Sequence, residues 1–140
     1  MTVFAAQSRE QLRAAYREAW RKLRESLPMQ PLEAQIADVI AAHPEYQPLL
    51  QSELSVSEEF AGGAENPFLH MGLHLALREQ LSTDRPAGIA RIHRRLQARL
   101  GSAHGAEHRM IEVLADVLWE AQRSASGGDE ALYLERLRGL

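Results

Sequence analysis

Apolar residues recur at every third or fourth position along most of this chain of 140 residues, which is the spacing of one face of an α-helix. Between residues 9 and 26 that face consists of Leu12, Tyr16, Ala19, Trp20 and Leu23. The same pattern predicts further helices at 31–43, 67–82, 103–124 and 131–138. One more helix is predicted to start at the signal of Asp84 and Pro86 and to end at residue 100. No segment alternates apolar and polar residues as a half-buried strand would. The pattern therefore predicts an all-α protein.

Residues that favour helix ends stand at the borders of these segments. Ser8 and Gln11 form a capping-box pattern before the first predicted helix, and Asn66 precedes Pro67 at the start of the third. Gly101 suits the C-terminal cap of the helix before it. These signals divide the chain into helices joined by short turns.

Helices joined in this way favour one architecture. We predict an up-and-down helical bundle of four to five main helices plus a short C-terminal helix, in a single domain that covers residues 1–140. The connection at 44–65 is the least regular part of the chain. Its length leaves open whether the helix at 31–43 is antiparallel to the helix at 67–82.

The composition excludes cysteine chemistry and indicates the cell compartment. It has no cysteine, which removes disulfides, thiolate chemistry and sulfur-ligated zinc together. No run of about 18 apolar residues is present, and the first residues do not form a signal peptide. The sequence therefore predicts a cytoplasmic protein that does not enter a membrane.

The charge pattern argues against a nucleic-acid partner. The formal net charge is −3, whereas affinity for nucleic acids depends on neutralising phosphates. Arginines nevertheless follow helical steps along the first helix, at Arg9, Arg13, Arg17, Arg21 and Arg24. Glutamates at three or four residues from them favour a solvated, salt-bridged face over a docking face.

Two pairs of histidines stand four residues apart, one in each of two predicted helices. His70 and His74 lie in NPFLHMGLHLALREQ, and His104 and His108 lie in AHGAEHRM. Residues four apart on a helix are neighbours, so each pair can offer two imidazole nitrogens to one cation. The chain has six histidines, for which about 0.2 such pairs are expected by chance. Two pairs therefore favour a metal site over histidines that are only packed.

The predicted topology gathers these pairs at one end of the bundle. Both occupy the first turns of their helices, and those two helices are parallel in an up-and-down bundle. His43 ends the helix at 31–43 and reaches the same end if that helix is antiparallel to the next. Glu107 falls inside an apolar arc, where a carboxylate is costly unless it is paired or coordinates an ion. The candidate metal ligands are therefore His43, His70, His74, His104, His108 and Glu107.

The types of ligand suggest the metal and the chemistry. Imidazoles with a carboxylate and no thiolate suit iron or zinc first, then manganese, nickel or copper. Five imidazoles exceed the needs of one cation, which favours a dinuclear site or an open catalytic one. If the protein is an enzyme, it is a metal-dependent hydrolase or oxidoreductase, with Glu107 as the candidate base. A small molecule or an anion would then bind at the metal, and the sequence leaves a homo-oligomer open.

Two other interpretations stay open. In one, the histidines and Glu107 form a structural core network without metal, and the arginine-rich face of the first helix docks a partner. In the other, facing histidines hold a haem. The segment from His104 to His108 also fits the H-x-x-E-H pattern of inverted zinc peptidases, but those are α/β enzymes and no strand is predicted here.

Four stretches of the chain resemble one known family. They are PLEAQIADVIAAHPEY (31–46), NPFLHMGLHLALREQ (66–80), AHGAEHRMIEVL (103–114) and LWEAQR (118–123). They resemble an uncharacterised bacterial helical family that is known only as a domain of unknown function. The resemblance covers nearly the whole chain, and it implies no activity, ligand or partner.

Overall fold

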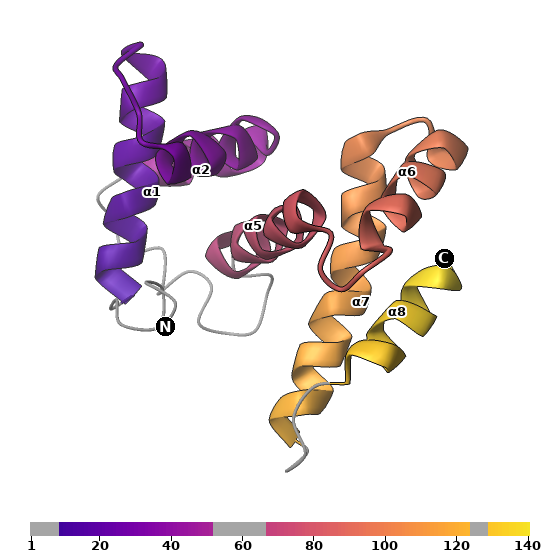
Figure 1. Ribbon diagram of the computed structural model, residues 1–140. Coiled ribbons are helices and arrows are strands. Elements are labelled where there is room, and N and C mark those ends of the chain that lie inside the picture. The colour runs from indigo at the N-terminus through magenta and orange to yellow at the C-terminus, as the bar shows by residue number, and fades with distance from the viewer. Residues whose placement is uncertain (1–8, 52–66, 124–128) are drawn as a thin grey trace. The chain divides into compact units, whose positions relative to one another are not determined.

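The computed structural model describes residues 9–51, 67–123 and 129–140, and every regular element in these ranges is a helix (Figure 1). The all-α class and the short C-terminal helix are therefore confirmed. The chain divides into two compact units, Met1–Met71 and Gly72–Leu140. The single domain that the sequence predicts stays a prediction.

The N-terminal unit is built on a pair of packed helices, α1 (Arg9–Arg24) and α2 (Pro31–Ala41). A 3₁₀ helix, η2 (Pro44–Tyr46), and α3 (Gln47–Gln51) follow. The buried apolar residues of α1, α2 and α3 are Tyr16, Ala19, Trp20, Ile36, Ala37, Val39, Ile40 and Leu50. Tyr16, Ala19 and Trp20 belong to the apolar face that the helical spacing predicts for the first helix.

Ion pairs connect and cover these helices. Lys22 Nζ lies 2.7 Å from Glu33 Oε2, which ties the end of α1 to the first turn of α2. Arg21 pairs with Glu18 and with Glu25 at 2.5 Å each along α1. This part of the arginine-rich face is therefore the salt-bridged surface that the sequence favours.

The C-terminal unit contains most of α5 (Pro67–Thr83), then α6 (Ile89–Leu100), α7 (Ala103–Arg123) and α8 (Glu130–Arg138). Helices α6 and α7 lie side by side and are joined by a tight turn (Figure 1). The core of the unit comes from all four helices. Its buried members are Leu77, Ile89, Ile92, Leu96, Ala106, Met110, Ile111, Leu114, Val117, Tyr133 and Leu137.

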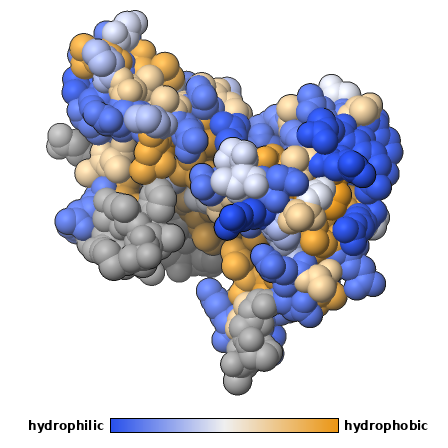
Figure 2. Space-filling model, viewed as in Figure 1, coloured by the Kyte–Doolittle hydropathy of each residue, from blue (hydrophilic) through white to orange (hydrophobic). Residues whose placement is uncertain are grey.

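Helix α6 is strongly two-sided. It buries Ile89, Ile92 and Leu96 against the core and exposes its arginines. The surface over α6 is accordingly mostly hydrophilic in the view of Figure 2.

Within the described residues, no helix has the length and apolar content that crossing a membrane requires.

The helix borders that differ from the prediction include the start of α6 and the end of α2. Helix α6 begins at Ile89 and not near Asp84 or Pro86. The reason is the backbone of the preceding turn, where Asp84 (φ 50°) and Gly88 (φ 101°) are both left-handed and interrupt any helix. Helix α2 ends at Ala41, so His43 lies just beyond it.

The predicted caps have mixed outcomes. Gly101 is the left-handed C-terminal cap of α6, with φ 74°, as predicted. The predicted caps at Ser8 and Asn66 lie outside the described residues.

Candidate metal centre

Helix α7 presents two histidine rings from its first two turns. Ser102 Oγ accepts a hydrogen bond of 2.9 Å from the backbone N–H of Gly105, which caps this end of the helix. His104 and His108 follow one turn apart, and their ring centroids are 4.3 Å apart. Both rings are half-buried. The helix start therefore holds the two imidazoles side by side.

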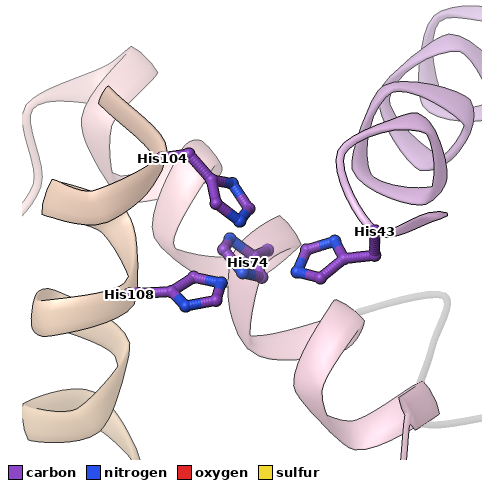
Figure 3. Close-up of side chains that lie close together, drawn as sticks. All are labelled: His43, His74, His104 and His108. Atoms are coloured by element: carbon purple, nitrogen blue, oxygen red, sulfur yellow. The ribbon is translucent and has the colours of Figure 1, made fainter. Parts of the chain in front are cut away.

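Helix α5 brings a third ring to this pair. His74 is completely buried, and its ring centroid lies 5.2 Å from that of His104 and 4.9 Å from that of His108. One ring nitrogen from each of the three histidines lies within 4.8 Å of the other two. Figure 3 shows the rings of His104 and His108 directed from α7 toward His74. Imidazoles from two helices that are distant in sequence thus meet inside the C-terminal unit.

Glu107 is buried beside this cluster, with 7% of its surface exposed. Arg78 of α5 donates to it through Nε, 2.9 Å from Oε1, and through Nη2, 3.4 Å from Oε2. Nδ1 of His74 lies 3.5 Å from the same Oε1. Burial would raise the pKa of Glu107, but the hydrogen bonds from His74 and Arg78 and the charge of Arg78 outweigh it and lower the pKa to about 2. The carboxylate is therefore ionised at neutral pH.

Glu107 does not belong to the group of close ligand atoms found among the described residues, which consists of histidines. The sequence pattern suggests it as a ligand or base, and the structure places its oxygens against Arg78 and His74. Arg78 is not among the residues that the sequence pattern selects. A signal for it is nevertheless visible, because His70, His74 and Arg78 repeat at intervals of four residues along one stripe of α5.

The N-terminal unit has a second histidine pair with an aromatic partner. The ring centroids of His43 and His70 are 5.0 Å apart, and Tyr46 stacks on His43 at 5.3 Å. Nδ1 of the buried His43 lies 2.7 Å from the backbone carbonyl oxygen of Val39. A carbonyl only accepts, so Nδ1 carries the proton and Nε2 carries the lone pair. The predicted roles of His43 and His70 as metal ligands stay predictions.

Other glutamates and the sixth histidine are not part of the group of close ligand atoms found among the described residues. Glu10, Glu45 and Glu112 are exposed. His93 is half-buried on α6, and its Nε2 has no hydrogen-bond partner among the residues that the structure describes.

Comparison with known proteins identifies a family. No significant match was found among curated proteins or among solved structures. One family model matches residues 8–139, which is nearly the whole chain and includes all the histidines described above. This match supports the expectation of an uncharacterised family. The chain belongs to the family described as "Domain of unknown function (DUF1841)".

Proposed function

We propose that the protein binds a divalent transition-metal ion through His74, His104 and His108. The observation that carries this proposal is the approach of three imidazole nitrogens to within 4.8 Å of one another. In a tetrahedral site with metal–nitrogen distances of about 2.0–2.1 Å, two ligand nitrogens are about 3.3 Å apart. Small rotations of the side chains close the remaining difference.

The surroundings of the rings support this chemistry. His74 is buried, and its neighbours on α7 are half-buried, so the three imidazoles are partly shielded from water. Neutral imidazole is a good ligand for zinc, iron, copper and nickel, and no thiolate is available. Zinc or iron is therefore the ion that we propose, as in the expectation from the sequence.

Three protein ligands leave at least one position on the ion open. Sites of this kind hold water or a substrate at the open position, whereas structural zinc sites are usually closed by four protein ligands. We propose that a small molecule or anion occupies this position.

We also propose that the protein works in the cytoplasm. The chain has no cysteine and therefore forms no disulfides, as is usual for cytoplasmic proteins.

Elemental analysis tests the proposal directly. Protein expressed without a histidine tag is expected to contain about one transition-metal ion per chain, and chelation is expected to lower its melting temperature. A variant with His74, His104 and His108 all replaced by alanine is expected to contain none. The matched control is H93A, which also removes a histidine from the C-terminal unit and should keep its metal.

Two experimental results would overturn the proposal. One is wild-type protein without metal whose melting temperature is the same with and without chelator. That result would favour the interaction module that the sequence leaves open. The other is a Soret absorption band, which would show haem in place of a simple ion.

His43 and His70 are a separate part of the proposal. We propose that both also bind metal and leave the open position free, and the support is chemical and comes from His43. The hydrogen bond from Nδ1 of His43 to Val39 fixes the tautomer in the manner usual for metal-binding histidines. H43A and H70A are each expected to weaken metal binding at least tenfold. Unchanged affinity in either variant would exclude that histidine.

A further inference from the structure

We propose that Glu107 is a positioning residue, which fixes His74 in the tautomer that binds metal, and that Arg78 holds Glu107 in place. This inference rests on the proposed metal site and adds its supporting groups. It also assigns Arg78 to the site. Neither role requires that Glu107 touch the ion.

The tautomer of His74 follows from the chemistry of its neighbour. The guanidinium of Arg78 can only donate, and it contacts both oxygens of Glu107, so both oxygens accept hydrogen bonds. Nδ1 of His74, which lies 3.5 Å from Oε1, must then be the protonated nitrogen. A neutral imidazole with a proton on Nδ1 has its lone pair on Nε2. His74 therefore offers Nε2 to a metal ion.

Arg78 determines where the carboxylate lies. Its guanidinium donates to both oxygens of Glu107, a two-point contact that fixes the plane of the carboxylate as well as its position. Oε1 is shared between Arg78 and His74. Rotation of Glu107 toward a metal ion would break the contact with Arg78. We therefore assign Glu107 the role of positioning His74 and not that of a metal ligand.

The same network joins the two helices that carry the ligands. Glu107 is on α7 between His104 and His108 in sequence, whereas His74 and Arg78 are one turn apart on α5. A hydrogen-bonded ion pair between α5 and α7 therefore sets how His74 faces the other two rings. In known metal sites, loss of such an outer carboxylate typically costs about 10–100-fold in metal affinity.

The first test needs no metal. Long-range ¹H–¹⁵N correlation spectra of the apoprotein report which nitrogen of each histidine carries the proton. We expect His74 in wild-type protein to be protonated on Nδ1, and we expect E107A to shift it to a mixture of tautomers. Wild-type His74 with its proton on Nε2 would overturn the inference.

The second test uses Co²⁺ as a spectroscopic probe of the ligands. E107Q keeps an oxygen acceptor but loses the charge, so we expect the positions of its Co²⁺ d–d bands to match wild type while the affinity falls about 10-fold. We expect R78M to weaken binding similarly. The controls are E112Q and R109M, which make the same changes at exposed positions of α7 and should bind as wild type does.

The outcomes separate the inference from the metal site itself. Shifted d–d bands in E107Q would show that Glu107 is a ligand and would overturn the positioning role. Wild-type affinity in both E107A and R78M would overturn it as well. Wild-type protein that binds no Co²⁺, zinc or iron would overturn the proposed function, while the apoprotein spectra would still decide the tautomer.

Discussion

Glu107 is a buried carboxylate beside the candidate metal centre, and its position in the sequence already points to that centre. Glu107 stands out in the sequence because it falls inside an apolar arc of its helix. Physical chemistry then requires a partner, since a buried unpaired charge costs several kcal/mol, on the order of 3–5. The structure supplies Arg78 and His74 as that partner. The sequence indicated the need for a partner but not its identity.

At this scale we predict that E107A destabilises the protein by about 2–3 kcal/mol. The substitution leaves the buried N–H of His74 and the partly exposed guanidinium of Arg78 without their acceptor. Urea unfolding of apoprotein measures the change in the free energy of unfolding. The control E112A, at an exposed position of the same helix, should change it by less than about 0.5 kcal/mol. Equal effects of the two variants would contradict the network.

At the scale of helices, the turn between α6 and α7 determines the position of the histidine pair. Gly101 ends α6 with a left-handed backbone, and its N–H donates to the carbonyl of Gln97 at 2.8 Å. Ser102 then caps α7, so His104 follows the turn almost at once. The register of His104 and His108 therefore depends on this short turn.

We predict that G101A lowers the free energy of unfolding by about 1–2 kcal/mol, because alanine is strained in a left-handed conformation. Thermal or urea unfolding measures the loss. G101N is the matched control, since asparagine tolerates this conformation better and should lose distinctly less. Equal losses of unfolding free energy in G101A and G101N would show that the glycine does not act by avoiding backbone strain at residue 101.

The helices themselves could be predicted closely because their period is a local property of the sequence. The segment predicted at 103–124 is Ala103–Arg123 in the structure, and that at 67–82 is Pro67–Thr83. The start of α6 was wrong because Asp84 caps from a distance. Its carboxylate accepts hydrogen bonds from the N–H groups of Gly88 and Ala90 across a turn. The spacing of apolar residues does not predict this turn.

At the scale of the molecule, the predicted convergence of histidines depended on topology. His74 meets His104 and His108 in the C-terminal unit because α5 and α7 both contribute to its core. An up-and-down arrangement was enough to predict this meeting. Arg78 was missed because its role comes from an ion pair between helices, and the sequence gives no distance between helices.

Alkaline pH should weaken the whole fold. Burial raises the pKa of Tyr133, whose hydroxyl donates to Gln80 at 2.7 Å, to about 12, and burial raises the pKa of Tyr16 to about 12 as well. Because both folded-state pKa values exceed the usual value of about 10, the neutral phenols stabilise the fold fully below about pH 10. This contribution is lost as the pH rises from about 10 through about 12.

We predict a loss of about 2–3 kcal/mol for each tyrosine over that interval. Urea unfolding at a series of pH values measures it. Y133F cannot ionise at this position, so its stability should fall about half as far as that of wild type between about pH 10 and 12. Identical pH profiles for Y133F and wild type would show that Tyr133 does not contribute.

The central claim is that imidazoles of this chain bind a metal ion, and X-ray absorption at the edge of the bound metal tests it most directly. We predict an inner coordination sphere with at least three nitrogens at about 2.0–2.1 Å, together with the more distant scattering that imidazole rings produce. The signal should lose imidazole scattering in H104A and keep it in H93A. A coordination sphere of oxygens without imidazole scattering in wild-type protein would contradict the account.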